Sequence, residues 1–465
     1  MQGLFDRAFE LPTSYFVAVA LVVVLSVEAL PRLRQLRGVF SVVVYATIAL
    51  WYLFDPLIGR AKNYSVFTSS ELELAYSQIC IFLISFRLLI ELCPKTPTVA
   101  LRKIEEFDFD RGPIVKVTVI AWAILFTIGL ARVNFNPMTA LFPLDARRNW
   151  ESYMWNRPRI GTTTSFLISA LGYLYTVICA FFGLLAVVTR RPGTRRLMIF
   201  LAMLTWPMFA LTGARSTVLT VLGPTILGVL LTKRWSPWKM AAFAVSIGLV
   251  INLTMLAMIE FRNSGFHSAL DGEALVTRIG RAKHLGFNMG EELLYMNRYQ
   301  STGQLKVEMG MNYLGNLLNF IPRPIWPNKP FVGREFALLR TGLYRGDVAA
   351  TISFGIVGQG VANFGKWLGP VIPALILVLY CSWAIRLLNT GHIFLRCCLF
   401  FIALAKVPNL GRDITLFDLW IVVFGYVATL MYERLVESRA AVRRTKLPHS
   451  PRGSTASPSH PVHYR

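Results

Sequence analysis

Arginine and lysine side chains recur between the apolar runs of this chain, and their chemistry is anion binding. The stretch "IPRPIWPNKP" at 321–330 sets an arginine and a lysine among four prolines, which predicts a rigid loop rather than a helix or central strand. Guanidinium donors match phosphate oxygens, and each charge-assisted bond contributes about 1.5–3 kcal/mol. We expect a phosphate or pyrophosphate site; the candidate residues are Arg215, Arg262, Arg323, Lys329, Arg334, Arg345 and Arg412.

Each of these residues has a plainer interpretation. A loop arginine can be a solvated charge, the proline loop can be a structural turn, and Arg215 in "LTGARSTV" can reach the membrane surface or pair with a nearby acid. The feature that favours a site is the clustering of positive charge on the membrane face where it is usually scarce. Arg340 lies in the same cluster.

Metal and nucleotide chemistry are not indicated by the sequence. The patterns GxxxxGK[ST], HExxH and GxSxG are absent, and "GQGVANFG" lacks the third glycine of a dinucleotide-binding loop. The six cysteines and six histidines show no metal-ligand spacing. We therefore expect neither a metal nor a cofactor, and an activity that survives EDTA.

The elements that would position these residues are transmembrane helices. Hydrophobic residues make up 54% of the 465-residue chain, and its mean hydropathy is +0.51. At about 20 residues per crossing, the apolar runs predict an all-α polytopic membrane protein with about 11 spans. They lie near 13–30, 39–57, 72–92, 114–133, 164–188, 197–211, 215–232, 240–259, 367–387, 395–409 and 418–432.

The basic loops set the expected orientation. Short segments rich in lysine and arginine at 31–37, 190–196, 232–239 and 433–446 fall on one side, which is the cytoplasmic side. They explain the net charge of +23 without nucleic-acid binding. Segment 134–163 and a large loop of short amphipathic helices at 260–349 then face outward, and 349–365 is expected to be half-inserted. The predicted divisions are 1–259, 260–349, 350–432 and a basic, disordered cytoplasmic tail at 433–465.

Three motifs resemble the Wzy-type O-antigen polymerases, also called oligosaccharide repeat-unit polymerases. "GMNYLGNLLNFIPRPIWPNKP" at 310–330 is similar to the family's glycine-tyrosine helix and proline-rich turn. "SFGIVGQGVANFGKWLG" at 353–369 is similar to its segment before a late span, and "TGARS" at 212–216 to its turn between middle spans. The chain departs from the pattern at Gln359 and Ala362, where relatives often carry an acidic residue and a tyrosine, so an acidic role there is in doubt.

This resemblance implies a glycosyltransferase that joins oligosaccharide units carried on undecaprenyl pyrophosphate, at the periplasmic face of the bacterial inner membrane. Donor and acceptor are both lipid-linked, and membrane lipids and a polysaccharide chain-length regulator are further candidate partners. The cationic residues would hold the leaving pyrophosphate. A direct displacement would invert the anomeric carbon, whereas a double displacement would need a carboxylate nucleophile.

Such a transfer needs a base for the acceptor hydroxyl proton. The candidates are Asp413, Asp347, Glu291, Glu292 and His284. We favour Asp413, because a carboxylate in a very short turn beside Arg412 is expected to be shielded from water.

Two alternative functions remain open. An O-antigen ligase-like enzyme would share the donor and would use a histidine of the large outer loop, for which His267 and His284 are available. A transporter or flippase of lipid-linked sugars would be expected to consist of two similar halves. The sequence shows no internal repeat of this kind.

Overall fold

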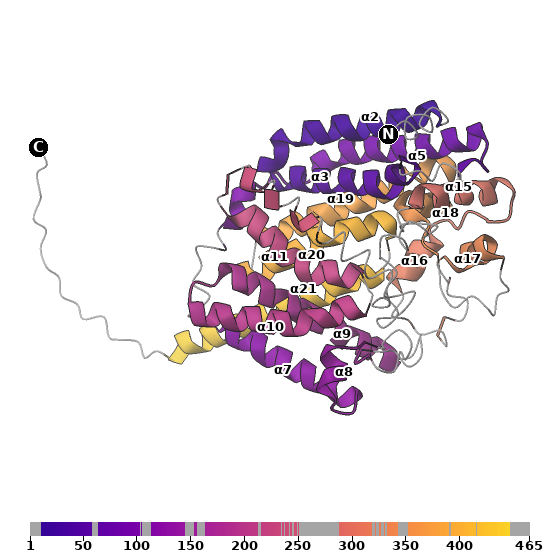
Figure 1. Cartoon of the computed structure of the whole chain (residues 1–465). Coiled ribbons are helices and arrows are strands. Elements are labelled where there is room, and N and C mark those ends of the chain that lie inside the picture. Colours follow the sequence, from indigo (N-terminus) through magenta and orange to yellow (C-terminus); the bar gives the residue numbers. More distant parts are fainter. Residues whose placement is uncertain are drawn as a thin grey trace, which may run out of the picture.

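The computed structural model is helical in all the elements that it defines (Figure 1). It describes residues 11–57, 64–102, 104, 113–144, 153–155, 163–212, 215–233, 235–236, 238–240, 242–243, 246–248, 250, 288–318, 321, 325–326, 330, 333–342, 352–389, 392–414 and 416–446. Within these residues there is no β-strand. The predicted all-α class is therefore confirmed.

Three N-terminal helices form one side of the bundle: α2 (Thr13–Ala29), α3 (Leu36–Ile48) and α5 (Ser69–Leu89) (Figure 1). A π-helical turn at Ala49–Leu53 prolongs α3. A capping box, in which Thr68 and Glu71 exchange hydrogen bonds, starts α5. Charged residues join one end of the three helices, and this network consists of Glu28, Arg32, Arg37, Arg87 and Glu91.

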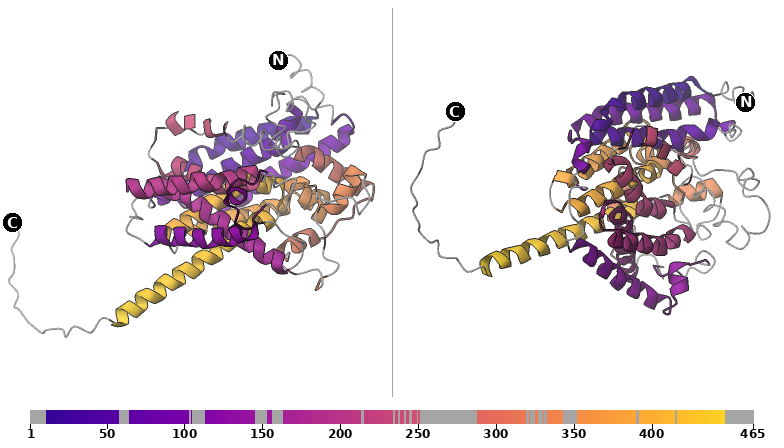
Figure 2. Two further views of the ribbon diagram at one scale, coloured as in Figure 1. Left: turned by 60° about the horizontal axis from the view of Figure 1, so that its bottom comes forward. Right: turned by 60° about the vertical axis from the view of Figure 1, so that its left-hand side comes forward.

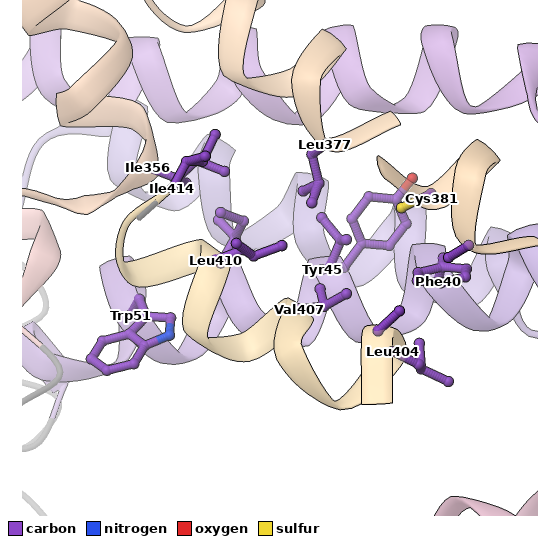
Figure 3. Packing of buried hydrophobic residues seen from close by; sticks show 14 of the residues in the cluster. Phe40, Tyr45, Trp51, Ile356, Leu377, Cys381, Leu404, Val407, Leu410 and Ile414 are labelled. Atoms are coloured by element: carbon purple, nitrogen blue, oxygen red, sulfur yellow. The ribbon is translucent and has the colours of Figure 1, made fainter. Parts of the chain in front are cut away.

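The rest of the bundle is built around α20 (Ile393–Arg412), with α9 (Thr163–Val188), α11 (Arg215–Thr232), α19 (Val371–Arg386) and α21 (Leu416–Lys446) among its neighbours. Figure 3 shows Val407 and Leu410 of α20 in the apolar core beside Tyr45 of α3. Further out lie α10 (Pro192–Leu211), α7 (Ile114–Arg132) and α8 (Pro137–Leu141). The end of α21 extends away from the body (Figure 2).

Four shorter helices gather at one end of the bundle: α15 (Met289–Ser301), α16 (Met311–Leu317), α17 (Arg334–Thr341) and α18 (Gly355–Leu368) (Figure 1). Residues 355–363 of α18 are all buried. A buried amide pair joins this end to α5, because Gln78 and Asn297 exchange two hydrogen bonds of 3.1 and 2.8 Å. The Gln78 amide also donates to the Lys366 carbonyl at 3.1 Å.

Seven helices of the described part are long and apolar enough to cross a membrane. They agree closely with seven predicted spans and are Leu36–Leu53, Ser69–Leu92, Ile114–Arg132, Leu167–Val188, Pro192–Leu211, Val371–Asn389 and Ile393–Arg412. Two further predicted spans correspond to shorter apolar helices, Thr13–Ala29 and Ser216–Thr232. The span predicted at 418–432 lies within α21, and most of 240–259 lies outside the described residues.

The glycines of α18 allow the closest helix packing at this end. A Cβ added at Gly360 would lie 1.9 Å from the Gly369 carbonyl oxygen, whereas one at Gly358 would make ordinary contacts of 3.5 Å or more. We expect Gly360→Ala to destabilise the protein by about 1–3 kcal/mol, because the backbone must shift. Gly358→Ala is the matched control and should be nearly neutral. Thermal unfolding of both variants in detergent measures the difference, and equal melting temperatures would contradict it.

Candidate functional site

Residues 310–318, which begin the motif segment 310–330, pack against the motif segment 353–369. The Asn312 backbone N–H donates to the Asn363 side-chain oxygen at 3.2 Å, and the Glu308 N–H donates to the Ala362 carbonyl at 3.0 Å. The rings of Tyr313 and Phe364 stack with centroids 6.1 Å apart. Helix α16 is thereby fixed against α18, although about 40 residues separate the two in sequence.

The C-terminal end of α20 joins the same place. The Gln359 amide makes two hydrogen bonds to the backbone of Ile414, of 2.9 and 3.2 Å, and the Asn316 amide donates to the Ile414 carbonyl at 3.3 Å. These bonds hold the preceding residue, Asp413, with only 7% of its surface exposed. Burial raises the pKa of Tyr313 well above its ordinary value, and the charge of Asp413 adds to this shift. We call Tyr52, Tyr313, Asn316, Gln359, Asn363 and Asp413 the junction.

The side-chain amide of Gln359 makes a pair of bonds that a carboxylate could not make. A carboxylate at this position could accept the Ile414 N–H but could not donate to its carbonyl. Gln359 does both and is completely buried. Its role in this chain is to hold the segment that carries Asp413.

A second polar cluster lies on α15 and α17. The Arg340 guanidinium bonds Glu292 at 2.9 and 3.1 Å and Glu291 at 3.1 Å, and stacks over the Tyr295 ring at 3.6 Å. The Asn288 amide donates to Glu292 at 2.9 Å. Glu291 and Glu292 are 4% and 3% exposed, so the cation partly offsets the cost of burying two carboxylates. We call Glu291, Glu292 and Arg340 the acidic triad.

Tyr52, a member of the junction, also packs against α15, the helix that carries the two carboxylates of the acidic triad. Its hydroxyl accepts the Val357 N–H at 2.9 Å. A Cβ at Gly355, which has φ +80°, would lie 2.2 Å from that hydroxyl, and one at Gly290 would lie 2.8 Å from the Tyr52 carbonyl oxygen. Both glycines are required for this close approach, and Gly290 directly precedes the triad's first carboxylate.

Burial and the neighbouring Glu292 charge raise the pKa of Glu291 to about 7, against the lowering effect of Arg340. The unfolded chain releases this proton near 4.5, so between these pH values only the folded chain holds it. Stability should therefore fall as pH rises from about 4.5 to about 7, by up to roughly 2–3 kcal/mol.

The measurement is the melting temperature of the wild type minus that of Glu291→Gln, from pH 4.5 to 8. We expect the wild type to lose stability relative to the variant across this window and to run parallel with it above pH 7. A difference that does not change with pH would contradict the shifted titration.

Lys406 was not singled out from the sequence and connects the third motif to the others. It is fully buried in α20, and its ammonium group donates to the Ser216 carbonyl of α11 at 3.3 Å. Ser216 belongs to "TGARS", and α20 continues from Lys406 to Arg412 and the junction. The sequence contains a signal for this residue. A lysine within the apolar run 393–407 is costly in a membrane, so its presence indicates a polar partner.

The structure describes some of the predicted site residues and not others. Asp413 is buried at the junction, whereas the neighbouring Arg412 is exposed at the end of α20. Arg215 and Arg334 are the first residues of α11 and α17. Arg340, which the sequence placed among the anion-binding cations, instead binds the two carboxylates of the acidic triad. The others lie outside the described residues and are Arg262, Arg323, Lys329, Arg345, Asp347, His267 and His284.

Within the described part of the chain, no group of three or more histidine, cysteine, aspartate or glutamate side chains could hold a metal ion. Comparisons with protein-family models, with curated proteins and with solved structures found no match to this chain.

Proposed function

We propose that this chain is a membrane glycosyltransferase that polymerises undecaprenyl-pyrophosphate-linked oligosaccharide units at the periplasmic face of the bacterial inner membrane. The observation that supports it is the convergence of the family-like motifs. Segments 310–330 and 353–369 meet at the junction, and α20 connects this place with "TGARS" through Lys406. These bonds join segments that lie far apart in the sequence through buried polar groups.

In this proposal Asp413 is the base. It takes the proton of the acceptor hydroxyl while that oxygen bonds to the anomeric carbon of the donor, and the bond from this carbon to pyrophosphate breaks. Undecaprenyl pyrophosphate leaves with the bonding electrons, and the anomeric carbon is inverted. Positioned acid–base groups of this kind contribute about 10²–10⁴-fold in rate.

The growing negative charge of the leaving group needs cations, and no metal is required if arginines supply them. Arg412 adjoins Asp413 and is exposed, so it can reach a lipid headgroup. We assign the same role to the cations that the sequence singled out on the outer face, including Arg323 and Lys329 of the proline loop.

The proposed membrane topology has about 11 spans, with 260–349 in the periplasm and the C-terminus in the cytoplasm. It is supported by the seven apolar helices and by the gathering of α15, α16 and α17 at one end of the bundle.

If this topology holds, single cysteines placed in 134–163 should react with a membrane-impermeant thiol reagent in intact cells. Labelling of a cysteine placed in 190–196 instead would show that the orientation is the reverse of the proposed one.

The experiment that tests the function is the glycan pattern of a strain that lacks the gene. We expect glycan caps of a single repeat unit, and a ladder restored by the wild-type gene. Unligated polymer would indicate a ligase-like enzyme. Lipid-linked units that accumulate on the cytoplasmic side would indicate a flippase.

A further inference from the structure

The Tyr313 hydroxyl is a buried donor that is left without a hydrogen-bond partner among the residues that the structure describes. Its ring is fixed by the stack on Phe364, and its helix is fixed by Asn312 and Asn316. The side chain therefore cannot turn toward water without breaking these contacts. A buried donor of this kind indicates a water or a ligand.

Two more polar groups belong to the end of α20, which joins the junction. Asp413 directly precedes Ile414, whose carbonyl accepts a hydrogen bond from Asn316 on the helix that carries Tyr313. Asn409 precedes Asp413 by one turn of α20, and its side-chain nitrogen is also buried without a partner in the described part of the chain. Together with Asn409, the junction thus offers one carboxylate acceptor, Asp413, and two donors, Tyr313 and Asn409.

These groups match the bonding capacity of an alcohol. A hydroxyl group donates one hydrogen bond and accepts two, so it can donate to Asp413 and accept from Tyr313 and Asn409. A phosphate oxygen accepts only and would face the Asp413 carboxylate without a shared proton. The charge at this place therefore favours a sugar hydroxyl over a pyrophosphate.

We infer that Tyr313 and Asn409 bind the attacking hydroxyl of the acceptor sugar and orient it on Asp413. This inference rests on the proposed function and names the acceptor subsite within it. The proton of the hydroxyl moves to Asp413, the oxygen lone pair forms the new bond to the anomeric carbon, and the pyrophosphate leaves with the electrons of the broken bond. The proton of Tyr313 stays on its oxygen throughout.

The test is Tyr313→Phe, which keeps the ring stacked on Phe364 and removes only the hydroxyl. With purified protein and lipid-linked repeat units, we expect kcat/KM for the acceptor unit to fall roughly three- to tenfold, as for the loss of one neutral hydrogen bond. Without substrate, the melting temperature should stay the same or rise, because the variant no longer buries an unpartnered hydroxyl.

Tyr45→Phe is the matched control. Tyr45 is completely buried and packs in the apolar core on α3, and its hydroxyl, like that of Tyr313, lacks a partner within the described residues. The Tyr45→Phe variant should leave kcat/KM for the acceptor unit unchanged.

The outcomes separate the two proposals. Normal acceptor kinetics in Tyr313→Phe overturn the acceptor subsite alone, and so does slower transfer accompanied by a lower melting temperature, which marks a structural hydroxyl. A wild-type protein that fails to extend the units overturns the proposed function, and the subsite with it.

Discussion

Asp413→Asn should reduce polymerisation by about 10²–10⁴-fold, the range measured for loss of a positioned base. Asparagine has the same shape as aspartate but cannot take the proton of the acceptor hydroxyl at neutral pH. The backbone of Ile414 holds this segment through Asn316 and Gln359, and asparagine at position 413 leaves these three bonds in place. The fold should therefore survive the change.

The measurement is the rate of extension of lipid-linked units by purified wild type and variant, with the melting temperature of each. Gln359→Glu provides a contrast, because it removes a donor to Ile414 and should lower stability as well as activity. An Asp413→Asn protein with normal stability and a rate within threefold of the wild type would exclude Asp413 as the base.

Arg340→Met should lower the free energy of unfolding by about 3–5 kcal/mol, as is typical when one member of a buried ion pair is removed. Methionine keeps much of the length of arginine but leaves Glu291 and Glu292 buried beside each other without its charge. We expect a melting temperature many degrees lower and a reduced yield of folded protein from membranes.

Two further variants test the physical cause. Arg298→Met removes the partner of Glu71, but both side chains are more exposed, at 28% and 22%, so the loss should be about 1 kcal/mol or less. Glu291→Gln and Glu292→Gln, combined with Arg340→Met, should recover much of the lost stability, because no buried charge remains. A combined variant no more stable than Arg340→Met would show that the arginine acts through packing alone.

The membrane helices could be read from the sequence because each depends on local composition. A helix formed by an apolar run of about 20 residues makes all its backbone hydrogen bonds within itself and needs no distant partner. Their ends were less predictable: α3 continues through a π-helical turn, and α20 starts before the expected residue. The π-helical turn contains Trp51, against which Gly411 of α20 packs, so this helix end lies against a distant element.

The site was only partly predictable. Asp413 was favoured because its turn is short, and it is buried. Arg340 was grouped with the anion-binding cations, because sequence alone does not reveal that α17 packs on the two carboxylates of α15. Lys406 was overlooked, although its charge in an apolar run was visible. What sequence could not supply in each case was the partner, which comes from a distant element.

The buried pair between Gln78 and Asn297 has a consequence for biosynthesis. The two residues are 219 positions apart, and at about 5–20 residues per second the ribosome needs roughly 10–45 s to travel from one to the other. During that interval the Gln78 amide sits in a newly inserted α5 without its partner, next to lipid or to the insertion machinery. Nascent chains that end before α15 should therefore be preferred targets of membrane proteases, whereas those that extend past α18 should escape them.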